Sequence, residues 1–135
     1  MSEALILFAH GSRDPEWVKP FEALREKLQQ RSPHVAVALA YLEASPPSLD
    51  ETIRALAARG VTTLRVLPLF LAMGKHLRND IPALAARVAA AHAGLTIEFL
   101  PALGEAPEFV DALVRIAERA AGPVQTRSDL APGDV

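Results

Sequence analysis

The sequence contains no cysteine among its 135 residues. This absence excludes disulfides, thiolate metal sites, iron–sulfur clusters and cysteine nucleophiles, so any metal ligand must be a histidine or a carboxylate. No apolar run approaches the roughly 18 residues that a membrane-spanning helix needs. The first residues, MSEALILFAHGSRD, have no basic region, and His10 interrupts their apolar run, so they predict a strand and not a signal peptide. We therefore expect a cytoplasmic protein without membrane contact.

The chain also lacks a strong charge of either sign, because its formal net charge is only −2. A general polyanion binder needs a basic surface, so nucleic acid is not an expected partner. There is no GxGxxG after the first apolar run, no GxxxxGK[ST] and no GxSxG. We expect no organic cofactor. Half of the residues are hydrophobic and 22% are charged, which is typical of one folded domain with a real core.

Short apolar runs alternate four times with segments of helical periodicity. The expected strands are residues 4–9, 35–41, 63–69 and 95–100, and the expected helices are 15–31, 48–60, 81–92 and 107–120. Right-handed crossovers turn this (βα)4 pattern into a single four-stranded parallel sheet with helices on both faces, a three-layer α/β sandwich. We expect one α/β domain over residues 1–121. Residues 122–135 have no apolar period and predict a flexible tail.

The stretch LPLFLAMGKHLRNDIP, residues 67–82, organises the candidate site. It begins as the end of a buried strand, turns at Gly74, and is expected to present His76 on a loop. Asp80 is expected to cap a helix that begins at Ile81. Ligands of open parallel α/β sheets bind just outside the carboxyl ends of the strands, which is where this loop falls.

Three polar residues follow three successive strands. His10 follows the first strand, Glu43 the second and His76 the third, with 33 residues between neighbours in the series. Parallel strands end at the same edge, so these side chains are expected on one edge of the sheet. Two imidazoles and a carboxylate suit a first-row divalent metal, and they also suit proton transfer near neutral pH. The same spacing is open to a second interpretation, in which they are unrelated loop residues.

The other two histidines serve as an internal contrast. His34 precedes the second strand and so falls at the opposite edge of the sheet. His92 ends a helix, where the dipole favours a cation. Both are interpreted as surface residues outside the site.

Cations flank the candidate histidines at Arg13, Lys75 and Arg78. A cation beside a metal repels it, so these residues point instead to an anionic substrate, such as a carboxylate or phosphate. The alternative is that they are solvated charges at the rim. Gly11 and Gly74 adjoin the histidines and would allow backbone to approach a ligand.

HGSRD after the first strand, an acidic residue after the second, and PLFLAMGKHLRNDIP after the third resemble the class II tetrapyrrole chelatases. The similarity is greatest to the short CbiX-type sirohydrochlorin chelatases and covers about residues 5–116. It implies insertion of Co²⁺ or Fe²⁺, with Ni²⁺ also feasible, into sirohydrochlorin in cobalamin or sirohaem biosynthesis. It also implies that His10 and His76 bind metal and accept pyrrole protons, and that Glu43 joins them as ligand or base. The residues assigned to substrate binding are Ser12, Arg13, Gly74, Lys75 and Arg78.

The short form of this family is expected to work as a homodimer, because a four-stranded unit offers one shallow cleft to a broad disc-shaped substrate. Leu69, Leu71 and Met73 run beyond the third strand and are candidates for the contact surface.

Three other functions fit part of the pattern. A carrier of metal or tetrapyrrole would bind the same ligands without turnover. A metal-dependent hydrolase would use two histidines and a glutamate, but it needs a spare general base beside them. A phosphohistidine enzyme would carry an arginine just before the first histidine, where this chain has Ala9.

Overall fold

The computed structural model describes residues 2–123. The chain divides into two compact units, Met1–Glu105 and Ala106–Val135. Most of the predicted tail, residues 124–135, lies outside the described residues. Within the described residues, no helix is long and apolar enough to cross a membrane.

The first unit is built on a four-stranded parallel sheet with the order β2-β1-β3-β4. The strands are β1 (Glu3–Ala9), β2 (Ala36–Tyr41), β3 (Thr63–Pro68) and β4 (Thr96–Phe99). The central strand β1 reads EALILFA, and Ile6 and Phe8 in it are fully buried. A continuous apolar run suits a strand that is covered on both faces, so the sequence accounts for this central position.

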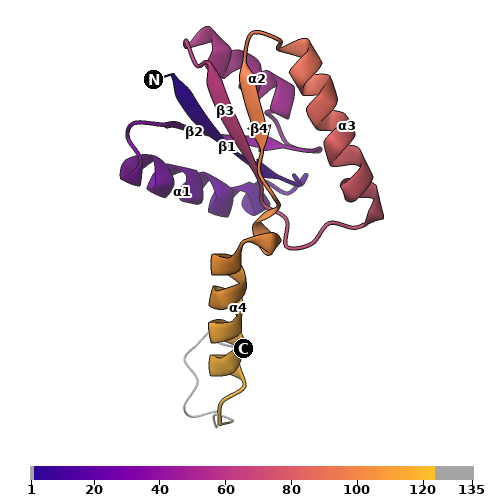
Figure 1. Ribbon diagram of the computed structural model, residues 1–135. Helices are drawn as coiled ribbons and strands as arrows, with labels where there is room; N and C mark the ends of the chain where they lie inside the picture. The colour runs from indigo at the N-terminus through magenta and orange to yellow at the C-terminus, as the bar shows by residue number, and fades with distance from the viewer. Residues whose placement is uncertain (1, 124–135) are drawn as a thin grey trace. The chain divides into compact units, whose positions relative to one another are not determined.

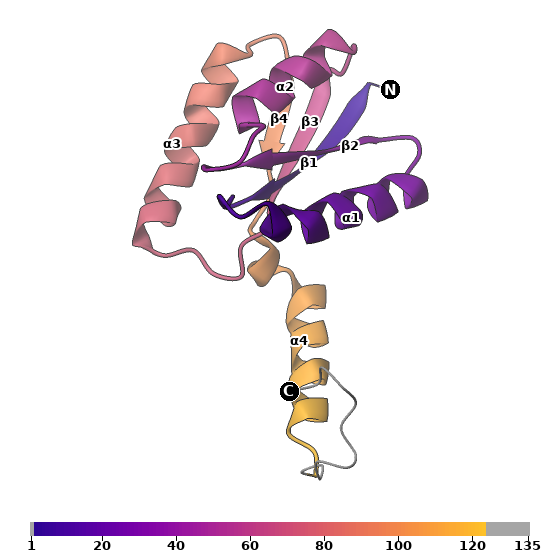
Figure 2. The same ribbon diagram turned by 180° about the vertical axis from the view of Figure 1, so that it is seen from behind.

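Helices cover both faces of the sheet, as Figures 1 and 2 show from opposite sides. They are α1 (Pro15–Arg31), α2 (Leu49–Ala58) and α3 (Lys75–Ala91), and a 3₁₀ turn, η1 (Leu103–Glu105), follows β4. The core cluster joins β1 and β3 to apolar residues of α2 and α3, including Ile53 and Val88. These two helices therefore share one face, with α1 on the other (Figure 1). The predicted three-layer α/β class is confirmed.

Capping groups predicted from the sequence fix the starts of two helices. The Asp14 side chain accepts a hydrogen bond from the Glu16 backbone N–H at 2.9 Å, and Pro15 occupies the first turn of α1. Ser48 and Glu51 form a reciprocal capping box at the start of α2. The hydrogen bonds from Ser48, backbone first and hydroxyl second, lower the pKa of Glu51 below its ordinary value of 4.5.

The start of α3 corrects the prediction. The helix begins at Lys75 and not at Ile81, so His76 lies in its first turn and not on a loop. Asp80 lies inside the helix, and the N-cap is Gly74, which makes no side-chain capping bond. Asp80 is a residue type that is common at N-caps, which favoured the later start. In the structure Pro82 lies within the helix, where its missing N–H leaves the Arg78 carbonyl without its usual donor.

The second unit contains α4 (Pro107–Ala120). Pro107 occupies the first turn, Glu108 lies near the N-terminus, and Arg119 lies in the last turn. This charge order complements the helix dipole.

Candidate functional site

The register of the sheet brings His10 and Glu43 together. Ala9 pairs with Tyr41, and the ladder continues past both strands. The Glu43 backbone N–H donates to the His10 carbonyl at 3.1 Å. Just beyond, His10 Nε2 lies 3.1 Å from Glu43 Oε1. The two side chains are 51% and 66% exposed, so the pair faces solvent at the carboxyl edge of the sheet.

Gly11 sets the close approach of the two loops. Its φ is +97°, a conformation that residues with a Cβ rarely adopt. A Cβ on this residue would lie only 1.7 Å from the Glu43 carbonyl oxygen. The glycine of HGSRD is therefore required for the Glu43 backbone to pass beside His10.

Ser12 ties the first loop to the second. Its backbone N–H donates to Ser45 Oγ at 3.0 Å, and its hydroxyl oxygen accepts from the Asp14 N–H at 3.1 Å. The Ser45 hydroxyl in turn donates to the Ser12 carbonyl. Arg13, which lies between these anchors, is exposed. These hydrogen bonds hold the residues on either side of Arg13, which follows His10 by three residues and has an exposed side chain.

His76 is placed differently from the other two candidates. Because Phe8 pairs with Pro68, the β3 side of His10 is occupied by Phe70, and the two rings lie edge to face with centroids 6.3 Å apart. His76 follows six residues later, exposed in the first turn of α3. Among residues 2–123, no three histidine or acidic side chains form a group that could hold a metal ion. The structure pairs His10 with Glu43 and leaves His76 outside such a group.

The His10–Glu43 pair has two chemical capacities. An imidazole nitrogen and a carboxylate oxygen at hydrogen-bond distance can pass a proton between them, and the carboxylate stabilises a protonated imidazole. The same nitrogen and oxygen atoms can also act as ligands of a borderline divalent metal.

His10 follows the end of β1, which is the first strand of the sheet along the chain. The chain runs from β1 to β2 on one side and then to β3 on the other, so β1 and β3 flank a topological switch point.

The start of α3 gathers positive charge. Gly74 is the N-cap, followed by Lys75, and Arg78 lies one turn on; all three are exposed or half-buried at the surface. The first turn of this helix contains no acidic residue. Free N–H groups, the helix dipole and two cations together favour an anion here.

The two remaining histidines behave differently from each other. His34 is exposed at the start of β2, as predicted. The prediction for His92 is wrong in part, because its side chain is only 12% exposed and its Nε2 lies 2.8 Å from Asp50 Oδ1. Asp50 belongs to the first turn of α2. His92 therefore links the end of α3 to the start of α2, a long-range contact that sequence spacing did not reveal.

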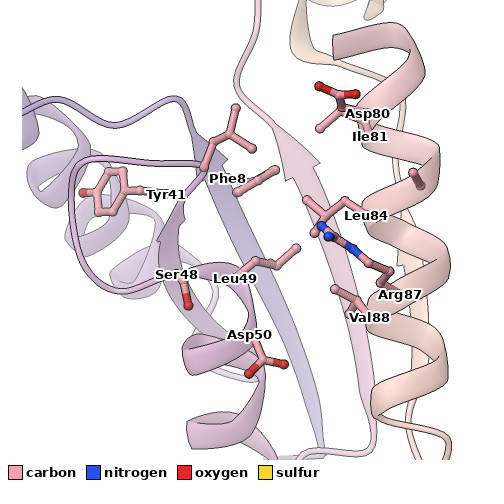
Figure 3. Close-up of a pocket in the computed structure, with 12 residues that line it drawn as sticks. Phe8, Tyr41, Ser48, Leu49, Asp50, Asp80, Ile81, Leu84, Arg87 and Val88 are labelled. Atoms are coloured by element: carbon pink, nitrogen blue, oxygen red, sulfur yellow. The ribbon is translucent and has the colours of Figure 1, made fainter. Parts of the chain in front are cut away.

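The structure contains a groove between α2 and α3 that was not predicted from the sequence (Figure 3). Its volume is about 520 Å³, and Phe8, Leu49, Leu84 and Arg87 are among the residues that line it. Arg87 follows Leu84 by three residues, so it borders the apolar stripe of α3. A cation at the margin of a buried stripe is the signal that could have indicated this groove.

The fold and its polar residues define a class of protein: an open parallel α/β protein with a histidine–carboxylate pair at the carboxyl edge of its sheet. The CbiX family model matches residues 4–120. The chain belongs to the CbiX family.

Curated relatives share the name sirohydrochlorin cobaltochelatase. The protein from Methanococcus aeolicus is 34% identical over 80 residues, which cover 59% of this chain and 56% of the relative. The protein from Methanothermobacter thermautotrophicus is 38% identical over 78 residues, covering 58% and 54%. The matched part is thus less than two thirds of the length of either relative.

Solved structures with this fold match more of the chain. A CbiX protein from Marinobacter aquaeolei, named for cobalamin (vitamin B12) biosynthesis, has a TM-score of 0.77 and 37% identity, covering 87% of this chain and 96% of that one. SirB from Bacillus subtilis with Fe³⁺ has a TM-score of 0.73 and 27% identity, covering 91% of this chain and 49% of SirB. A sirohydrochlorin chelatase SirB from the subspecies spizizenii, in complex with cobalt, has a TM-score of 0.71 and 27% identity, covering 90% and 52%.

Proposed function

We propose that this protein is a sirohydrochlorin chelatase that inserts Co²⁺ or Fe²⁺ into the tetrapyrrole in cobalamin or sirohaem biosynthesis. The observation that carries the proposal is the His10–Glu43 pair, 3.1 Å apart at the carboxyl edge of a CbiX-family fold. The names of the curated relatives support the substrate and cobalt, and SirB with Fe³⁺ supports iron as a second metal.

The reaction exchanges one divalent ion for two pyrrole N–H protons. Each proton must pass to a base before or while the metal bonds to the ring nitrogens. His10 accepts one proton through its neutral imidazole, and Glu43, in contact with it, stabilises the resulting charge or takes the second proton. Both side chains are more than half exposed, so protons leave directly to water.

His76 delivers the metal in this proposal. Its position in the first turn of α3 leaves it exposed and apart from the His10–Glu43 pair. A single imidazole holds Co²⁺ or Fe²⁺ weakly, which favours transfer, since an ion bound by a full ligand set would be harder to release. Ring nitrogens replace His76 as the ion enters the macrocycle.

Carboxylate arms of the substrate meet the cations around this edge. Arg13 and Arg78 offer forked guanidinium groups, and Lys75 adds a point charge beside the free N–H groups that follow Gly74. Ser12, whose loop is held by Ser45, keeps Arg13 close to His10.

A homodimer would cover the substrate from a second side. Leu71 is 68% exposed, while the adjoining loop is held by the Gly104 N–H, which donates to the Phe70 carbonyl at 2.9 Å. A contiguous apolar patch around Leu71 would suit a protein contact. Leu69 and Met73, both half-buried, would extend it. Sedimentation at micromolar concentration should show a dimer, and a monomer with full activity would refute this arrangement.

The absorbance of sirohydrochlorin distinguishes the metal-free from the metallated ring and tests the proposal. Purified protein should accelerate the change with Co²⁺ or Fe²⁺ over the protein-free rate at the same pH, and Ni²⁺ is the comparison ion. A protein that binds the ring without accelerating insertion would be a carrier, and the chelatase proposal would then be wrong.

A further inference from the structure

The groove between α2 and α3 is a concave surface, and all the residues that line it belong to the first unit. Its volume of about 520 Å³ falls in the range of small-molecule sites. Its floor is apolar and is made of residues from β1, the β2 end, α2 and α3: Phe8, Leu42, Leu49, Ile81, Leu84 and Val88. None of the residues assigned above to metal or substrate lines it.

Arg87 is the cation that lines this groove. Figure 3 shows its side chain extending from α3 toward the middle of the groove, beside Leu84 and Val88. Among residues 2–123, no carboxylate lies within ion-pair distance of its guanidinium. A guanidinium over an apolar floor, without an ion-pair partner in the protein, is suited to a carboxylate on a ligand.

Two carboxylates stand at the two ends of the groove (Figure 3). Asp50 is already engaged, because Arg54 Nε lies 3.0 Å and His92 Nε2 2.8 Å from its two oxygens. Asp80 has no ion pair among the described residues and therefore repels an anion at its end. The one place in the groove that favours a ligand carboxylate is thus Arg87, between the two ends.

The groove is continuous with the carboxyl edge of the sheet. Phe8 lies two residues before His10, and Leu42 lies immediately before Glu43. On α3, Arg87 lies eleven residues beyond His76, roughly 16 Å along the helix axis. A broad disc-shaped ligand that is anchored at the edge would therefore have to extend the margin of its ring into the groove before a side arm could meet Arg87.

We infer that this groove is a binding site for one apolar margin of the tetrapyrrole, with a carboxylate arm paired to Arg87. The inference rests on the proposed function and adds a residue that sets affinity for the carboxylated substrate. The apolar floor buries ring edge and arm methylenes, and Arg87 fixes the end of the arm.

The groove can be tested without an insertion step by measuring the binding of metal-free sirohydrochlorin through the fluorescence of the ring. The variant Arg87→Gln should weaken binding about tenfold, the loss expected for a charge-assisted hydrogen bond. The variant Ala83→Trp, which places a large ring at an exposed position lining the groove, should weaken binding as well. The difference between Arg87→Gln and wild type should shrink in about 0.5 M salt, because an exposed ion pair is screened.

Matched controls separate the groove from general effects. Arg59→Gln removes an exposed arginine at the end of α2, and Ala86→Trp adds the same ring to an exposed alanine of α3 that does not line the groove. Both should bind like wild type. If Arg87→Gln and Ala83→Trp bind as tightly as their controls while wild type accelerates insertion, the groove inference is overturned and the proposed function stands. If wild type neither binds the ring nor accelerates insertion, the proposed function fails first.

Discussion

Replacing Gly11 with alanine tests how the His10–Glu43 pair is held. The new Cβ would start 1.7 Å from the Glu43 carbonyl oxygen, and real contacts of this kind are essentially never under 3.0 Å. The Glu43 backbone must therefore retreat by more than an ångström, which breaks its hydrogen bond to the His10 carbonyl. A displacement of about 1 Å in a catalytic group can lower a rate about a hundredfold. We expect a loss of that size in metal insertion.

Gly60→Ala is the matched control for backbone strain. Gly60 has a φ of +89°, close to that of Gly11, but nothing lies within 4 Å of the place that a Cβ on it would take. Both variants should lose roughly 1–2 kcal/mol of unfolding free energy because of the positive φ. Urea unfolding should show a larger loss for Gly11→Ala, and only that variant should lose activity. Equal stabilities and a wild-type insertion rate for Gly11→Ala would refute the reasoning.

Three other predictions concern single side chains. His10→Ala and His76→Ala should each lower the insertion rate about a hundredfold or more, with circular dichroism unchanged, whereas His34→Ala should have the wild-type rate. If His34→Ala lost as much activity as His76→Ala, the placement of the site at the carboxyl edge of the sheet would be wrong. His92→Ala should lower the free energy of unfolding in urea by about 1 kcal/mol, because it removes the contact between His92 and Asp50. The control His34→Ala removes no such contact and should stay within about 0.5 kcal/mol of wild type. Glu51→Gln should destabilise the protein at neutral pH, because it replaces the carboxylate with a neutral group that can still cap the helix. The difference should vanish as pH falls through the lowered pKa of Glu51, since protonation removes the same charge in the wild type; an unfolding difference that persists in strong acid would argue against a role for this charge.

Much of the fold could be predicted because local and global signals agree. ALILFA is apolar on both faces and became the central strand, and the Asp14 and Ser48 caps set the starts of α1 and α2 as expected. The start of α3 could not be predicted in this way. Pro82 has two acceptable positions, at the first turn or inside a helix, and the neighbouring residues do not decide between them.

The part of the candidate site that lies next to the strand ends could be predicted from the sequence. His10 follows β1 by one residue and Glu43 follows β2 by two, so the register places them side by side, and the glycine at position 11 lets the two loops come close enough for the 3.1 Å contact. His76 is separated from its strand by the residues 69–75, and register says nothing about such a link. The contact of His92 with Asp50 and the position of Arg87 both depend on how α2 and α3 stand on the sheet, which is a tertiary property that periodicity does not specify.

The most direct test of the central claim is the number of metal insertions per protein chain. Sirohydrochlorin and Co²⁺ should be supplied in about hundredfold excess over protein, and the absorbance should be followed until it no longer changes. A chelatase should convert many equivalents of substrate per chain. Conversion that stops at one equivalent per chain, or a rate equal to that without protein, would contradict the account.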